Sequence, residues 1–396
     1  QLIARGSARY DLGMLGGHPT VTPPMWTTLA TGAYPCTHGI SGFQRIVPGK
    51  PTIQGYNLDS RNCEAEPLWN VTVEAGIKTL VFHWPGSSWP PTSESSNLAV
   101  VEGTQPTSIN MGIAKCDDGL LVVAAAEIKA YSFRKQGHSN NGAGCIITDL
   151  EEEEPQEHGA VDEEGGFKAL SGKNIRNIML SAADGEGVAE FTTCDLANTP
   201  LRPAQGWAKE QPGAREFTLM LKDGLVRRPA LVVPNKQGIY DRVEIYTSKK
   251  ETEPFVILTT EDRRKFDVQD TYTINQETIV NNRYYTLLEL SPDGSKVRIY
   301  LSNAFDLSKD NLFHPKGLYQ DILREVGCVP AIPTGGGAIP ELVENVMLPC
   351  WENYTAWQAR ALNYMIHQQQ YEIVFSHLHN IDCLGHAFWE WAKNRQ

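Results

Sequence analysis

Two short apolar runs, each preceded by a helix-like segment, constrain the fold of this chain more than any other feature. Residues 77–83 (IKTLVFH) follow a helix-like stretch at 67–75, and residues 371–378 (YEIVFSHL) follow an amphipathic stretch at 354–370. A continuous apolar run between polar loops is typical of a strand that is buried on both faces of a parallel sheet. The order of helix, strand and loop therefore predicts an α/β fold.

The chain between these two runs has a different texture. From residue 115 to 310 it consists of short β-rich runs, and the Asp-Gly pairs at 223–224 and 293–294 favour hairpins. We therefore expect three parts: residues 1–114 begin a catalytic α/β domain, residues 115–310 form a β-rich, largely antiparallel insertion, and residues 311–396 continue the α/β domain. The sheet interrupted by the insertion resumes after it.

Charge and cysteine content exclude several classes of protein. The 396 residues include 35 basic and 47 acidic residues, and the formal net charge of −12 argues against binding to nucleic-acid polymers or anionic membranes. The sequence contains no run of about 18 apolar residues, so it predicts no membrane span. The eight scattered cysteines contain no CxxC pair, which favours a reducing compartment such as the cytoplasm over a disulfide framework. The oligomeric state does not follow from the sequence.

The first chemically informative segment is residues 18–40 (HPTVTPPMWTTLATGAYPCTHGI). Proline is favoured in the first turn of a helix, so we expect Thr22, before Pro23, to be the N-cap of a helix that ends at Gly32. A hydroxyl there lies at the positive end of the helix dipole, where backbone N–H groups can bind a phosphate oxygen. Ordinary helix capping explains the same pattern.

The second informative segment is residues 375–389 (FSHLHNIDCLGHAFW), at the carboxyl end of the second predicted strand. Open α/β sheets bind their ligands at this end. Asp382 and His386 are four positions apart, so a helical turn would place a carboxylate and an imidazole side by side, as Zn²⁺ requires. A hydrogen-bonded surface pair is the alternative. His377 and His379 either reach a metal or substrate or hydrogen-bond to neighbouring ligands and backbone.

Taken together, these elements resemble the type I phosphodiesterase and nucleotide pyrophosphatase family of the alkaline phosphatase superfamily. The resemblance rests on the pattern TPPxxxTxxTGxxPxxHGI that begins at Thr22, on the strand and loop residues FHWPG, and on the D-x-x-x-H pair of Asp382 and His386. It covers residues 1–88 and 354–391. It implies an alkaline-phosphatase-like α/β sandwich with a mostly parallel central sheet, interrupted by the β-rich insertion.

The resemblance also implies an activity. Members of this family are metal-dependent phosphohydrolases, so the chain is expected to come from a phosphodiesterase or nucleotide pyrophosphatase that acts on a small phosphoester. Thr22 takes the place of a metal-bound nucleophile that forms a phosphoenzyme. Asp382 and His386 take the places of ligands to one of two divalent metal ions, which are zinc or, alternatively, manganese. Metal coordination would lower the pKa of the Thr22 hydroxyl. His38 is expected to have a structural role in its loop.

The chain departs from the family pattern in two respects. The remaining metal ligands fall before residue 1 and after residue 396, so we expect a fragment that lacks both ends and is inactive by itself. Phe43 stands where nucleotide-cleaving members carry an asparagine that contacts the phosphoryl oxygen. Two alternatives therefore stay open: a noncatalytic binding protein or pseudoenzyme of the same fold, and a phosphomutase or phosphotransferase. The sulfatase pattern C/S-x-P-x-R is absent around Thr22.

Overall fold

The structure is a computed structural model, and its description of the chain has gaps. The described residues are 19–47, 49–102, 115–126, 130–136, 146–153, 170–171, 178–181, 188–191, 195–209, 211–308, 310, 312–331 and 340–382. The chain divides into two compact units. Unit 1 comprises residues 1–113, 310–325 and 360–379, and unit 2 comprises residues 114–309, 326–359 and 380–396.

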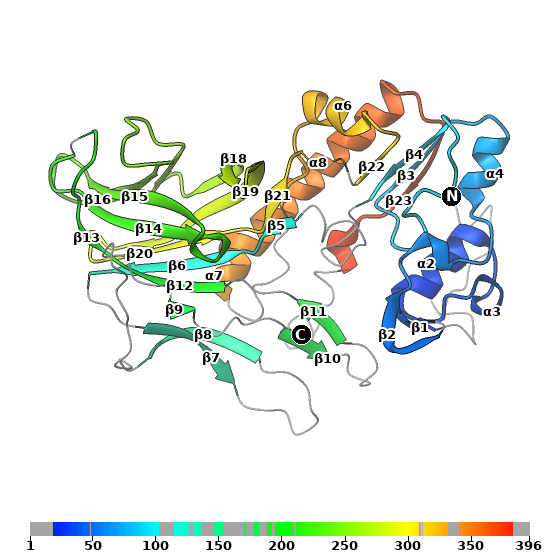
Figure 1. The fold of residues 1–396 in the computed structure, drawn as a ribbon, viewed down its shortest axis with the longest axis horizontal. Helices are drawn as coiled ribbons and strands as arrows, with labels where there is room; N and C mark the ends of the chain where they lie inside the picture. Colours follow the sequence, from blue (N-terminus) through cyan, green and yellow to red (C-terminus); the bar gives the residue numbers. More distant parts are fainter. Residues whose placement is uncertain are drawn as a thin grey trace, which may run out of the picture. The chain divides into compact units, whose positions relative to one another are not determined.

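The centre of unit 1 is a four-stranded sheet with the strand order β22-β4-β3-β23 (Figure 1). Strand β3 (Thr79–Phe82) pairs in parallel with β4 (Leu98–Val101) on one side and with β23 (Ile373–Ser376) on the other. Strand β22 (Phe313–His314) is antiparallel to β4. The two apolar runs of the sequence are thus neighbouring parallel strands. β3 is fully buried as predicted, but β23 is only half-buried, because it ends the strand order of this sheet.

Helix α4 (Leu68–Glu74) covers the sheet of unit 1 with one apolar face. Trp69 and Val73 are four positions apart, so their side chains lie on the same side of the helix, and both are buried. Gly76, at a φ of 81°, follows the end of this helix, as predicted. The core that these side chains build also contains Ala30, Val81, Leu98 and Val100, and Trp84, Trp89 and Phe375 pack against it.

The other elements of unit 1 are short. They are α2 (Thr22–Thr31), α3 (Pro35–His38), the antiparallel pair β1 (Gln44–Val47) and β2 (Lys50–Tyr56), the 3-10 turn η1 (Ser60–Asn62) and α6 (Leu318–Glu325). Helix α8 (Leu348–His367) contributes residues to both units. None of the described helices combines the length and the apolar character needed to span a membrane.

Unit 2 is built from two larger sheets. The eight-stranded sheet follows the order β5-β21-β19-β20-β6-β12-β9, with β18 added beside β19, and the five-stranded sheet follows the order β13-β14-β15-β16-β17. The first sheet contains β5 (Lys115–Asp117), β6 (Leu120–Ala125), β9 (Leu170–Ser171), β12 (Asp195–Pro200), β18 (Arg264–Ile274), β19 (Glu277–Leu290), β20 (Lys296–Leu301) and β21 (Ala304–Asp306). The second contains β13 (Arg202–Pro203), β14 (Arg215–Leu221), β15 (Val226–Pro234), β16 (Tyr240–Ile245) and β17 (Val256–Thr259).

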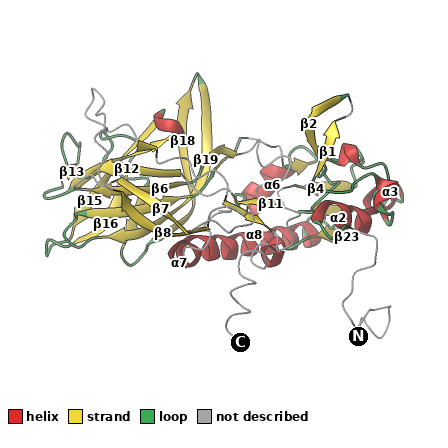
Figure 2. Cartoon of the chain, turned by 90° about the horizontal axis from the view of Figure 1, so that it is seen from below, coloured by secondary structure: helices red, strands yellow, loops and turns green. Residues whose placement is uncertain are grey.

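Smaller elements complete the description of unit 2. They are the pairs β7 (Ala130–Gln136) with β8 (Ile146–Glu153) and β10 (Ile178–Ser181) with β11 (Val188–Phe191), the turn η2 (Lys222–Gly224), α7 (Pro340–Leu342) and the π-helical turn η3 (Val343–Met347). Figure 2 shows the long hairpin that β18 and β19 form.

The two larger sheets share one core, because alternate residues of their strands point between them. In β14, Phe217, Leu219 and Leu221 are buried, and they join a cluster with Tyr285 of β19 and Ile299 of β20. The predicted hairpins are confirmed: residues 223–224 join antiparallel strands β14 and β15, and residues 293–294 join β19 and β20. The fold is therefore a mixed α/β architecture with several sheets.

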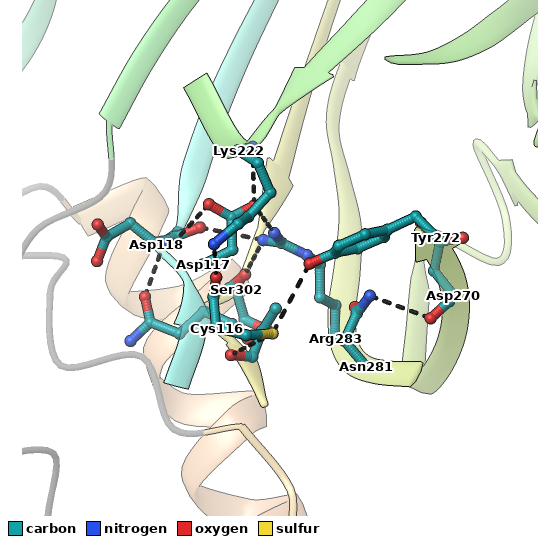
Figure 3. Close-up of polar contacts among 12 residues, drawn as sticks. Cys116, Asp117, Asp118, Lys222, Asp270, Tyr272, Asn281, Arg283 and Ser302 are labelled. Carbon is teal, nitrogen blue, oxygen red and sulfur yellow. Dashed lines mark hydrogen bonds and ion pairs between the residues drawn. The ribbon is translucent and has the colours of Figure 1, made fainter. Parts of the chain in front are cut away.

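A buried charged network ties strands of the eight-stranded sheet together (Figure 3). The guanidinium of Arg283 is 1% exposed, forms an ion pair with Asp117, and donates to the carbonyl oxygens of Asp118 at 3.0 Å and Ser302 at 2.7 Å. The backbone N–H of Lys222 donates to Asp117 at 3.2 Å. The network joins the β5 end to β19 and to the β14–β15 turn, and it has a structural role because its charges compensate each other.

Candidate functional site

Thr22 is the first residue of helix α2 and not its N-cap, so that prediction is wrong. The N-cap is Val21, whose backbone is extended, and no side chain caps the helix. The reason lies in the next residues: Pro23 and Pro24 have no N–H group for a hydroxyl to cap, and the N–H of Met25 donates to the Val21 carbonyl at 3.3 Å. That bond closes the first turn one residue earlier than predicted.

The hydroxyl of Thr22 is consequently not used in holding the helix. Among the described residues it makes no hydrogen bond, and the residue is half-buried. The predicted helix end is confirmed, because Gly32 adopts a φ of 68° and donates its N–H to the Thr28 carbonyl at 2.8 Å. Thr22 therefore presents a hydroxyl at the positive end of a ten-residue helix.

Helix α2 packs against the loop that leaves the carboxyl end of β3. The hydroxyl oxygens of Thr27 and Ser87 lie 2.9 Å apart and are buried. The indole N–H of Trp84 donates to the Trp26 carbonyl at 3.3 Å, and the two indole rings meet edge to face at 4.7 Å. Gly86 has a φ of 135°, a region that only glycine adopts readily. The contacts hold the first turns of α2 beside this loop.

Three imidazoles gather at the carboxyl end of the paired parallel strands β3 and β23. Phe82 of β3 is in register with Ser376 of β23, so His83 and His377 follow at equivalent positions of the two strands. The ring of His379 lies 4.9 Å from that of His377. Burial, together with the nearby His377 and His379, lowers the pKa of His83 to about 3. His83 is therefore a neutral imidazole at physiological pH.

The imidazole cluster, defined as His83, His377 and His379, is in contact with helix α2. The His377 ring lies 4.6 Å from the ring of Trp26, with the planes inclined at 68°. Trp26 follows Thr22 by four residues, so both lie on one side of α2. The structure thus brings Thr22 and the predicted residues His377 and His379 to the same end of the unit 1 sheet, where β3 and β23 have their carboxyl ends.

Two of these histidines, His377 and His379, were candidates from the sequence, whereas His83 was missed. The available signal was its position directly after a buried parallel strand, at the end where α/β sheets place their ligands. His38 has the structural role that was predicted. It is fully buried, and its ring lies between the Thr28 hydroxyl and the Ile40 backbone N–H.

Phe43, the residue that departs from the family pattern, lies in a loop that Asn57 holds. The Asn57 side-chain amide donates to the Gly42 carbonyl at 2.8 Å, and its backbone N–H donates to the Phe43 carbonyl at 2.8 Å. The Phe43 ring is 37% exposed. It fills no core position, so its place in the chain is not explained by packing.

Of the two predicted metal ligands, Asp382 and His386, the structure describes only Asp382. Asp382 is exposed and is the last described residue of a helical segment that begins at residue 379, after β23. It belongs to unit 2, whereas Thr22 belongs to unit 1. His386 lies outside the described residues. The pairing of Asp382 with His386 therefore stays a prediction.

The chemistry of the predicted donors fits a divalent ion. A hydroxyl, a carboxylate and an imidazole are donors that Zn²⁺ and Mn²⁺ accept. Within the part of the chain that the structure describes, no group of three or more histidine, cysteine or acidic side chains is arranged to hold a metal ion. The described donors are thus of the right kind but do not form a complete site.

Comparison with protein families gives a match for the part of the chain that contains Thr22. Residues 1–153 match the type I phosphodiesterase / nucleotide pyrophosphatase family. The resemblance drawn from the Thr22 pattern is confirmed by this match, and the family is part of the alkaline phosphatase superfamily. The match extends beyond residue 88, where the motifs end, and it does not include Asp382 or His386. Comparisons with curated proteins and with solved structures give no match.

The family match carries general expectations for chemistry. The family contains phosphoric diester hydrolases, and its members typically depend on divalent metal ions. A phosphoester or nucleotide substrate fits such a family. Among the described residues of the matched segment, Thr22 combines a nucleophilic atom with a position at a helix start, beside the ends of parallel strands.

Proposed function

We propose that this chain is part of a metal-dependent phosphodiesterase of the nucleotide pyrophosphatase type, in which Thr22 is the nucleophile. The observation that supports the proposal best is the Thr22 hydroxyl, which lies in the family-matched segment at the start of α2 and is not engaged in capping. The proposal includes the α/β sandwich arrangement that is typical of the alkaline phosphatase superfamily.

In the proposed reaction, the Oγ1 atom of Thr22 attacks the phosphorus atom of a small phosphodiester. The new bond joins Oγ1 to phosphorus, the bond from phosphorus to the leaving oxygen breaks, and the proton released by the hydroxyl ends on that oxygen, so that an alcohol leaves. Water then attacks the phosphothreonine and regenerates the hydroxyl. The helix dipole of α2 favours negative charge at Thr22 throughout, because its positive end lies there.

Thr22, Asp382 and His386 are the residues of this chain that would hold the divalent ions, zinc or manganese. When bound, such ions supply Lewis-acid stabilisation of the developing negative charge and lower the pKa of a coordinated hydroxyl. The described residues contain no group of three or more histidine, cysteine or acidic side chains that could hold a metal ion. We therefore expect these 396 residues by themselves to bind metal weakly and to show little turnover.

The test measures hydrolysis of bis-p-nitrophenyl phosphate by the full-length gene product with added Zn²⁺ or Mn²⁺. Thr22→Ala should lower kcat by at least about 10³-fold, because alanine has no hydroxyl to form the covalent bond to phosphorus. The matched control is Thr31→Ala in the last turn of the same helix, which should retain kcat. Turnover that survives Thr22→Ala would disprove the nucleophile assignment. A full-length protein without any turnover would favour the noncatalytic alternative.

A further inference from the structure

We propose that His377 contacts the substrate, donating an imidazole N–H to a non-bridging phosphoryl oxygen of the phosphoester that reacts at Thr22. This inference rests on the proposed function and adds a residue outside the family-matched segment.

The start of α2 offers few hydrogen-bond donors. Two of its first three residues are prolines, Pro23 and Pro24, which have no N–H. The N–H of Met25 is used by the Val21 carbonyl. A helix start usually binds an anion through several free N–H groups, and here only the N–H of Thr22 remains among the first three helical residues. Further donors for a phosphoryl group must come from neighbouring elements.

The sheet of unit 1 places imidazoles at the carboxyl ends of β3 and β23. Because Phe82 and Ser376 are paired in register, the parallel strands β3 and β23 end together, and His83 and His377 leave them at the same level. Ligands of open α/β sheets bind outside the carboxyl ends of their strands. An imidazole N–H there is a suitable donor to an anion in a chain whose net charge of −12 disfavours anions at long range.

His377 is connected with Thr22 through Trp26 of the same helix. The 4.6 Å contact between the rings of His377 and Trp26 places this histidine against α2. Four residues separate Trp26 from Thr22, which corresponds to about 6 Å along the helix axis and to the same helix face. A phosphoryl group bound to the Thr22 hydroxyl therefore lies within one helical turn of the ring that His377 touches.

His377 differs from the other two members of the imidazole cluster in its exposure to solvent. His83 and His379 are 1% and 3% exposed, whereas His377 is half-buried and so has an accessible side. Its ring is held between Trp26 and the His379 ring. We infer that His83 and His379 form the buried support and that His377 is the member that faces a ligand.

The experiment measures binding of inorganic phosphate to the full-length protein by isothermal titration calorimetry, with and without added Zn²⁺. His377→Phe keeps a ring against Trp26 but removes the N–H, and it should weaken phosphate binding by at least about tenfold. His377→Gln keeps a side-chain N–H and should recover part of the affinity. The matched control is His367→Ala, an exposed histidine of unit 1 in the last turn of α8, which should bind phosphate like the wild type.

The outcomes separate this inference from the proposed function. Thr22→Ala should abolish turnover and still bind phosphate, with an affinity that again depends on His377. Turnover that survives Thr22→Ala would disprove the assignment of Thr22 as the nucleophile. A loss of phosphate binding in His377→Phe would still support a contact between His377 and phosphate. The contact is disproved if His377→Phe binds phosphate within twofold of the wild type while circular dichroism shows both proteins folded. It is also disproved if the wild type binds phosphate under neither condition.

Discussion

The imidazole of His38 links helix α2 to the segment after α3 through the hydroxyl of Thr28. Nε2 of His38 lies 3.0 Å from Thr28 Oγ1, and Nδ1 accepts a hydrogen bond from the Ile40 N–H at 3.1 Å. Because Nδ1 is the acceptor, the neutral ring carries its proton on Nε2 and donates it to the Thr28 hydroxyl. The pair therefore helps to hold the helix that carries Thr22.

We predict that these two residues are coupled in stability and not in catalysis. Thr28→Val should lower the free energy of unfolding by about 1 kcal/mol, and His38→Ala by about 2–3 kcal/mol, because the latter also leaves the Ile40 N–H without its acceptor. Urea unfolding of both single variants and the double variant should give a coupling energy of about 1 kcal/mol. A fall in kcat without loss of stability in His38→Ala would instead indicate a catalytic role.

A second prediction concerns the pH dependence of stability that His83 causes. Its pKa in the folded protein is about 3, below the value of 6.5 for an unperturbed histidine, so between these values the unfolded chain binds a proton that the folded chain does not. Its contribution to stability is complete above pH 6.5 and is lost as the pH falls towards 3. Between these two pH values, the free energy of unfolding should change by up to about 1.4 kcal/mol per pH unit, because the unfolded chain binds one more proton than the folded chain.

The measurement compares unfolding in urea at pH 7 and at pH 5 for the wild type and His83→Asn. Asparagine tolerates the left-handed backbone that His83 adopts, with a φ of 56°, and it does not titrate in this range. The variant should lose less stability than the wild type between the two pH values. Equal losses would show that His83 is not responsible.

A third prediction tests the backbone of the loop beside α2. Gly86→Ala should destabilise the protein by about 1–3 kcal/mol, because alanine rarely adopts a φ of 135°. Space is not the cause: an added Cβ would lie 3.5 Å from Thr27 Oγ1 and 3.6 Å from the Pro23 carbonyl oxygen, which are ordinary contacts. Gly42→Ala is the control, since Gly42 has no positive φ and no atom within 4 Å of an added Cβ. Thermal unfolding should show a lower Tm for Gly86→Ala and an unchanged Tm for the control.

A fourth prediction addresses the charged network of unit 2. Arg283→Met should lower the free energy of unfolding by about 3–5 kcal/mol, because it leaves Asp117 without its buried ion-pair partner. The exposed Arg324, which pairs with Asp321 at 2.8 Å, provides the control, and Arg324→Met should unfold at the same denaturant concentration as the wild type. If both variants behaved alike, the Arg283 network would contribute no more than a surface pair.

Local sequence patterns predicted secondary structure and helix ends better than they predicted the start of α2 and the burial of β23. The Asp-Gly hairpins and the helix at α4 depend on local backbone preferences and on side-chain spacing, and both were predicted. The N-cap at Thr22 was wrong because a hydrogen bond from Met25 to Val21 competed with capping. The half-exposure of β23 was missed because a strand's apolar run does not reveal whether another strand covers its far edge.

The sequence by itself determined the alternation of helix and strand, the β-rich character of residues 115–310 and the family-typical pattern around Thr22, because these depend on residue types and on spacing along a few turns of chain. Only the tertiary structure decided that His83 and His377 end paired strands and that Trp26 brings α2 to them. Residues 83 and 377 are almost 300 positions apart, and strand register, which no local pattern specifies, sets their meeting.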